Sequence, residues 1–213
     1  MIAPTLHYIH DPLCGWCYAV APMVEAVSKA GIRIKMHGGG LWEPASSLAP
    51  DKRAYIRRSD TRIAGLSGVT FGPAYLDGLL SAADTVFWSR PTIAAVLAAR
   101  TMAEGADLRM MHAIQRAHYV EGRRVVEPAV LAEIASTIEL AEGAFLDAMA
   151  AVEVDDHIDG TRRWMQELGL RGFPSFVLEQ DGALVPVQHE PFYGRPDAFL
   201  HALMTITAAP AAA

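Results

Sequence analysis

The chain has 213 residues, of which 52% are hydrophobic and 20% are charged, and its formal net charge is −6. This composition is typical of a compact soluble protein, and a chain of this length can bury a substantial core. The negative charge gives no reason to expect nucleic acid or an anionic membrane as a partner. No run reaches the roughly 18 apolar residues that a membrane helix needs.

The start of the chain does not resemble a secretory signal. Residues 1–5 contain no basic side chain, and a strand pattern begins at once. If Met1 is the true start, we expect a cytoplasmic protein. Cytosolic thiols are mostly kept reduced, so a disulfide between the chain's only two cysteines would be transient and catalytic.

Both cysteines stand in the motif Cys14-Gly15-Trp16-Cys17, between a predicted strand and a predicted helix. Residues 5–10 alternate as a strand, and an apolar-periodic run continues to Ala30 as a helix, with Pro22 predicting a kink. Positions i and i+3 share a helix face, so the two thiols can form a disulfide. We therefore expect a thiol–disulfide site.

Position assigns the two thiols different roles. The free N–H groups and the positive dipole end of a helix favour an anion, so we expect a lowered pKa and a nucleophilic thiolate for Cys14. Cys17, one turn further and more shielded, is the expected resolving thiol. Two other interpretations are half of a zinc site, although no second Cys-x-x-Cys or close His pair exists, and two inert core cysteines.

The rest of the chain completes a recognisable order of elements. A second strand is predicted over 32–37, Gly38-Gly39-Gly40 ends it, and a late hairpin has its turn at Asp181-Gly182. Helices are predicted over 51–65, 72–82, 90–104, 107–120, 128–138, 141–151, 156–168 and 196–207, and the hairpin strands over 174–179 and 184–187.

This order is βαβ, a helical block, then αββα, which is an α/β thioredoxin fold split by an all-helical insertion. The predicted thioredoxin-fold domain covers 1–43 and 155–208, the insert covers 44–154, and 209–213 is a frayed tail. Without a Ser/Pro-rich linker, we expect the insert to pack against the βαβ unit.

Three segments make the chain resemble the DsbA-like branch of thioredoxin-fold proteins, in particular its cytoplasmic members predicted to be disulfide isomerases. Pro22, five residues after Cys17, looks like the kink proline of the active-site helix. Residues 171–176, Arg-Gly-Phe-Pro-Ser-Phe, are similar to the family's cis-proline loop. Residues 116–123, followed by Glu-Pro-Ala-Val-Leu at 127–131, look like a recurring segment of its helical insert.

The resemblance implies a cis bond before Pro174 and a platform of Phe173 and Pro174 along which a substrate chain docks. Phe173 departs from the smaller residues common at this place. The implied activity is thiol–disulfide exchange or disulfide isomerisation on a protein or small-molecule substrate. No metal or organic cofactor is expected, but glutathione or a thioredoxin-type reductase is implied as the electron partner.

Four neighbours are candidates for tuning the thiols. The dipeptide Gly15-Trp16 between the cysteines sets their redox poise, and across thioredoxin-fold proteins the potential spans roughly −270 to −120 mV. His10 and Asp11 lie just upstream, where a cationic imidazole lowers and a carboxylate raises the pKa of a thiol. More often, such residues only end a strand and shape a turn.

Two rival functions remain at this point. Asp11-Pro12 followed by Trp16-Cys17-Tyr18 also resembles the glutathione-linked kappa-class branch, whose members have one nucleophilic position and lack the second cysteine. The other rival is a non-catalytic, chaperone-like binding module, in which the Met-rich insert forms an adaptable apolar groove. Core packing is the alternative role for those methionines.

Overall fold

The structure is a computed structural model that describes residues 3–208, so the tail predicted at 209–213 lies outside the described residues. Its centre is a four-stranded sheet in the order β2-β1-β5-β6. β1 pairs in parallel with β2, whereas β5 is antiparallel to both β1 and β6. The bounds are β1 Thr5–His10, β2 Arg33–Gly38, β5 Ser175–Gln180 and β6 Ala183–Val187.

The hairpin between β5 and β6 turns where it was predicted. Asp181 has φ 48° and Gly182 has φ 84°, and this left-handed backbone at both central residues is what a tight two-residue hairpin requires. The turn therefore fixes the register of β6, whose Val187 pairs with Phe176 of β5.

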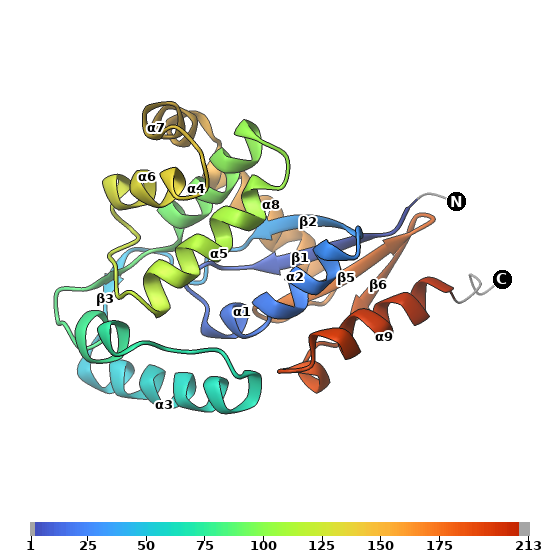
Figure 1. Cartoon of the computed structure of the whole chain (residues 1–213), viewed down its shortest axis with the longest axis horizontal. Coiled ribbons are helices and arrows are strands. Elements are labelled where there is room, and N and C mark those ends of the chain that lie inside the picture. Colours follow the sequence, from blue (N-terminus) through green and yellow to red (C-terminus); the bar gives the residue numbers. More distant parts are fainter. Residues whose placement is uncertain (1–2, 209–213) are drawn as a thin grey trace.

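Helices cover both faces of the sheet (Figure 1). α2 (Ala21–Lys29) and α9 (Pro196–Ala208) lie on one face, against Leu6 and Tyr8 of β1. α8 (Val154–Glu167) lies on the other, where Met165 packs against Ile9 and Val177. Because successive side chains of a strand point to opposite faces, β1 supplies apolar contacts to both layers.

The helix after the cysteine motif is divided in two rather than kinked. α1 covers Gly15–Ala19 and α2 begins at Ala21, with Val20 between them. Pro22 lacks an N–H and cannot donate to the carbonyl of Tyr18, so the helical ladder is interrupted there. This corrects the single helix to Ala30 and gives the motif a short helix of its own.

The insert contains mainly helices, but two predictions for it are wrong. Strands β3 (Ser46–Ser47) and β4 (Val86–Phe87) form a small antiparallel sheet within the segment predicted to be all-helical, since two residues are too few to show a period. The helix predicted over 72–82 is a π-helix, η1, over Ala74–Leu79. The other elements are α3 Pro50–Ser67, α4 Ser89–Met102, α5 Ala106–Tyr119, α6 Pro128–Ser136, α7 Glu142–Ala151 and, near the C-terminus, the 3-10 turn η2 Glu190–Phe192.

One apolar core runs from the sheet into the insert. Met110 and Met111 of α5 and Ala98 of α4 are buried in the same cluster as Leu6 and Tyr8 of β1. The insert methionines thus serve mainly as packing, which leaves the binding-module interpretation without its adaptable groove.

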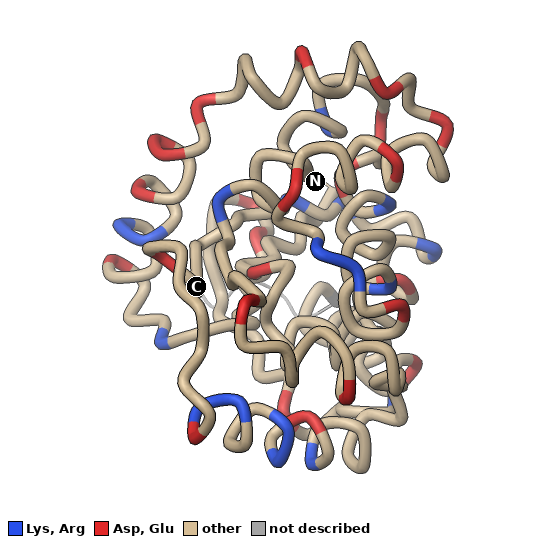
Figure 2. The backbone as a smooth tube through the Cα atoms, turned by 90° about the vertical axis from the view of Figure 1, so that its left-hand side faces the viewer, with Lys and Arg blue, Asp and Glu red and all other residues tan. Residues whose placement is uncertain are grey.

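Charge is distributed unevenly over the insert (Figure 2). α3, at the bottom of that view, has five basic residues and two acidic ones, whereas acidic residues predominate in the upper part of the view. No helix within residues 3–208 has the length and hydrophobicity that crossing a membrane demands.

Candidate active site

The two cysteines lie at the carboxyl end of β1, on the first turn of α1. Cys14 is the residue that caps α1, with an extended backbone (φ −96°, ψ 115°), and Cys17 is one turn later. Both are free thiols and both are buried, Cys14 with 4% of its surface exposed and Cys17 with none. The strand end and the helix start thus bring the pair together at the edge of the core.

Cys17 is the more enclosed thiol. Burial above all, and then the hydrogen bond and charge interaction with Cys14, raise the pKa of the Cys17 thiol well above its usual value. The backbone N–H of Asp11 donates to its Sγ at 3.5 Å, and the hydroxyl of Tyr8 donates to its carbonyl at 3.2 Å. Cys17 is therefore held as a protonated thiol behind Cys14.

The loop before β5 reaches the first cysteine. The peptide bond Phe173–Pro174 is cis, and the thiol of Cys14 donates to the Phe173 carbonyl at 3.6 Å. The Phe173 ring points toward the loop after β2: a Cβ added at Gly39 would be 2.2 Å from its Cε1. The ring is thus accommodated where Gly39 has no side chain.

Asp11 ties the cysteine turn to that same loop. Its carboxylate accepts from the N–H of Leu13 at 2.9 Å and from the N–H of Leu41 at 2.7 Å. Burial raises the pKa of Asp11 to about 6, although hydrogen bonds from Ser89, Leu41 and Leu13 act in the opposite direction. The structure therefore gives Asp11 a positioning role and also places it beside Cys17.

His10, the other upstream candidate, packs into the core. Its ring lies 5.1 Å from that of Tyr8, and neither ring nitrogen has a hydrogen-bond partner among the described residues. Burial, followed by the charges of His157, His37 and Arg100, lowers the pKa of His10 to about 3. His10 is thus neutral at physiological pH and supplies no cation to the thiols.

A cleft of about 570 Å³ opens beside the motif, in the size range of small-molecule sites. Trp16 borders it with Tyr193, whose ring is 5.1 Å away, and Phe173 and Pro174 form another wall. Three exposed arginines complete it: Arg62 of α3, Arg171 before the cis-proline, and Arg195 before α9.

Several of these residues were not predicted from the sequence. Arg62, Tyr193, Arg195 and His189, whose Nε2 lies 3.1 Å from the Pro174 carbonyl, come from segments far apart in the chain. No local motif marks them. The basic residues of α3 were the one feature of the sequence that could have pointed to Arg62.

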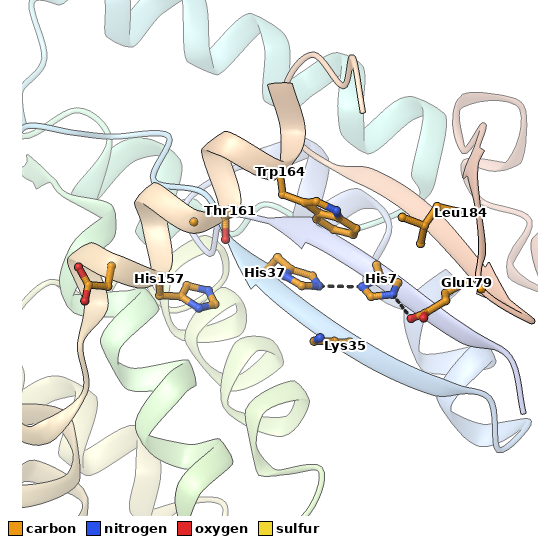
Figure 3. Close-up of a pocket in the computed structure, with 11 residues that line it drawn as sticks. His7, Lys35, His37, His157, Thr161, Trp164, Glu179 and Leu184 are labelled. Atoms are coloured by element: carbon orange, nitrogen blue, oxygen red, sulfur yellow. Dashed lines mark hydrogen bonds and ion pairs between the residues drawn. The ribbon is translucent and has the colours of Figure 1, made fainter. Parts of the chain in front are cut away.

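A second cavity, of about 510 Å³, lies under α8 on the other face of the sheet (Figure 3). His7 is joined to His37 (Nδ1 to Nε2, 2.9 Å) and to Glu179 (Nε2 to Oε2, 2.8 Å), and the Trp164 ring packs on both imidazoles. It shares no lining residue with the cysteine cleft. Over residues 3–208, no group of three or more His, Cys, Asp or Glu side chains is placed to hold a metal ion.

The chain is similar to several solved structures. The cytosolic disulfide reductase DsbM from Pseudomonas aeruginosa is 42% identical and has a TM-score of 0.89, with 95% of this chain and 98% of that chain covered. A structure of that reductase with GSH matches at 39% identity and a TM-score of 0.88, covering 96% of this chain and all of that one.

A candidate protein disulfide isomerase from Nitrosomonas europaea is 25% identical, with a TM-score of 0.80 and coverage of 95% and 96%. No curated protein matches the chain. The model of the DSBA-like thioredoxin domain matches residues 5–194, which is nearly the whole chain. The protein therefore belongs to the DSBA-like thioredoxin domain family.

Proposed function

We propose that the protein is a cytoplasmic thiol–disulfide oxidoreductase that works as a disulfide reductase with glutathione as its electron donor. The observation that carries the proposal is the pair of free thiols at the start of α1, with Cys14 against the Phe173 carbonyl and Cys17 enclosed behind it. The chain is similar over nearly its full length to a cytosolic disulfide reductase, which supports both reduction as the direction of the reaction and the cytoplasm as the compartment.

The reaction begins at Cys14, because this thiol is the less buried of the two and lies against Phe173, which lines the cleft, whereas Cys17 is fully buried. The Cys14 thiolate attacks one sulfur of the substrate disulfide, the other sulfur leaves and takes a proton, and a mixed disulfide forms. Cys17 then loses its proton and attacks the Cys14 sulfur, which releases the second substrate thiol and leaves a Cys14–Cys17 disulfide.

Two glutathione molecules then reduce the Cys14–Cys17 disulfide and leave as oxidised glutathione. In sum, one substrate disulfide is reduced for each glutathione disulfide that forms. The raised pKa of Cys17 fits the second step, because a protonated thiol does not compete for the substrate and is activated only inside the mixed disulfide.

The cleft has the chemistry to hold glutathione. That tripeptide carries two carboxylates and a thiol, and guanidinium groups pair with carboxylates through two parallel hydrogen bonds. Arg62, Arg171 and Arg195 line the cleft beside Trp16. The presence of GSH in a structure of the related reductase supports this assignment.

The test compares Cys14→Ser with Cys17→Ala in the reduction of insulin by glutathione, followed as oxidised glutathione formed. Cys14→Ser should lose the activity, because the remaining thiol, Cys17, is fully buried and protonated. Cys17→Ala should accumulate a mixed disulfide between Cys14 and glutathione, visible in the intact mass.

Full activity of Cys14→Ser would overturn the proposal. Conjugation of glutathione to an electrophile that survives Cys17→Ala would instead favour the kappa-like transferase.

A further inference from the structure

The helical insert places one acidic side chain directly against the cysteine motif. Asp60 of α3 is buried, with 3% of its surface exposed. A Cβ added at Gly15 would lie 2.9 Å from Asp60 Oδ1 and 3.0 Å from Ile63 Cδ1. The carboxylate therefore approaches the first residue of α1 in the space where any other residue would carry a side chain.

One oxygen of this carboxylate is anchored by a hydrogen bond. Oδ2 accepts a hydrogen bond from the Tyr75 hydroxyl at 2.9 Å. Oδ1 is the oxygen nearest Gly15, and no Lys or Arg within residues 3–208 forms an ion pair with Asp60. The charge of a buried carboxylate without a counter-charge is weakly screened, so it interacts strongly with other ionisable groups nearby.

Asp60 meets the cysteine motif at Gly15, the residue that follows Cys14. Burial raises the pKa of Tyr119 most, and the charges of Tyr75, Asp60, Cys14 and Cys17 raise it further, so Tyr119 lies near Asp60 and near both thiols. Besides Tyr75, whose hydroxyl bonds the carboxylate, the elements packed around Asp60 carry the following titratable or charged groups: Cys14, Cys17 and Tyr18 at α1, His118 and Tyr119 of α5, and, on α3 itself, Arg57 and Arg62.

We propose that Asp60 is a positioning residue that sets the reduction potential of the Cys14–Cys17 pair. Its carboxylate makes the pair a stronger reductant. The inference rests on the proposed function. The disulfide form of the pair is uncharged, whereas the reactive dithiol form carries a thiolate, and a nearby carboxylate disfavours that charge. Destabilising the reduced form drives electrons toward the substrate.

The effect depends on pH in the physiological range. Burial raises the pKa of Asp60 to about 7, against the opposing hydrogen bond from Tyr75. Above that pH the carboxylate opposes the thiolate, and below it the neutral acid does not. Reduction of the pair is thus accompanied by proton uptake at Asp60.

The test is the equilibrium constant of the cysteine pair with glutathione, measured from pH 5.5 to 8.5 in the full-length protein. Asp60→Asn keeps an acceptor for the Tyr75 hydroxyl but removes the charge. At pH 8 we expect the variant to be about tenfold less reducing, and at pH 5.5 to match the parent protein. Asp51→Asn, the same change on the exposed first turn of α3, should leave the curve unchanged.

Tyr75→Phe provides an independent variant should Asp60→Asn fail to fold. Loss of the hydroxyl removes the hydrogen bond that lowers the pKa of Asp60, so the pH-dependent step should move to higher pH. Equal curves for Tyr75→Phe and the parent, or a shift in Asp60→Asn that is the same at every pH, would overturn the inference. Neither result would affect the proposed function, which is tested separately by the activity of Cys14→Ser and by the mixed disulfide of Cys17→Ala.

Discussion

Phe173 and Gly39 fit together at the point where the proposed substrate platform meets the sheet. The Phe173 carbonyl accepts from the Cys14 thiol, so the position of this residue decides where the backbone lies beside the nucleophile. The ring is placed against bare backbone at Gly39, where a Cβ would be 2.2 Å from Cε1 and 2.3 Å from Cζ. A bulky residue before the cis-proline is therefore matched by a glycine 134 positions earlier in the chain.

Gly39→Ala should disturb this fit, because the added methyl group cannot share the space of the ring. We expect a loss of roughly 1 to 3 kcal/mol in the free energy of unfolding, as for overpacked cores. Because Phe173 would have to move, insulin reduction should slow as well. Urea denaturation and the glutathione-coupled assay measure the two effects.

Gly65→Ala is the matched control, since nothing lies within 4 Å of a Cβ at this position inside α3. A helix-interior alanine there should stabilise by up to about 1 kcal/mol and leave activity unchanged. If Gly39→Ala retains both stability and rate, the ring does not position the platform.

At the scale of elements, α5 and η1 are joined where their backbones meet. The N–H of Gly72 donates to the Tyr119 carbonyl at 2.8 Å. Gly122 has φ 66°, and a Cβ there would lie 2.3 Å from the Ala74 carbonyl oxygen. This contact holds η1, and with it Tyr75, against the helix that carries Tyr119.

Gly122→Ala should separate these elements, because both the left-handed backbone and the close carbonyl exclude a methyl group. We expect a loss of roughly 2 kcal/mol or more in the free energy of unfolding. Hydrogen exchange should be faster in α5 and η1 than in β1. Gly143→Ala in α7, where a Cβ meets nothing within 4 Å, should be neutral or stabilising. A neutral Gly122→Ala would contradict the role of this contact.

Local signals explain which elements were predictable. The strands of the central sheet and most helices show a hydrophobic period, or a residue that ends the element, within their own sequence. The turn at Asp181-Gly182 is an example. β3 and β4 have two residues each, and their pairs Ser46–Phe87 and Ser47–Val86 are 41 and 39 positions apart, so no window contains their signal. Pro22 did mark an interruption, but whether it kinks or ends a helix depends on neighbouring packing.

The same reasoning applies to the site. Cys14 and Cys17 were found because their chemistry is contained in four residues. Asp60 was missed because nothing in α3 distinguishes it from an ordinary surface acid until the fold brings it to Gly15. His10, which was considered as a cation, is made neutral by burial that its own sequence neighbourhood does not reveal. Residues whose role depends on long-range contacts are those that the sequence left undetermined.

For the whole molecule, buried histidines predict sensitivity to acid. Burial lowers the pKa of His118 to about 3, and neither ring nitrogen has a hydrogen-bond partner in the part of the chain that the structure describes. Between the unfolded value near 6.5 and about 3, the unfolded chain therefore binds a proton that the folded chain does not. Stability falls as pH drops through this window.

Asp11 and Asp60 act with the opposite sign. Their raised pKa values, about 6 and about 7, mean that the folded chain retains protons which the unfolded chain has lost above its ordinary value near 3.8. These two acids lower stability as pH rises through that window. The measured profile is thus a sum in which each histidine must be isolated by its own substitution.

His118→Phe isolates one of them, because its site is already aromatic: the rings of Tyr75, Phe87 and Tyr119 surround it at 4.7 to 5.8 Å. The difference in unfolding free energy between pH 7.5 and pH 5 should become smaller by about 1 to 2 kcal/mol, since one pH unit below an unfolded pKa corresponds to at most about 1.4 kcal/mol. Denaturant titrations at both pH values measure it. His201→Gln, on the exposed side of α9, should leave the difference unchanged. An unchanged difference in His118→Phe would mean that this imidazole takes up its proton without unfolding the chain, and the acid sensitivity would then have to come from His10 and the other buried rings.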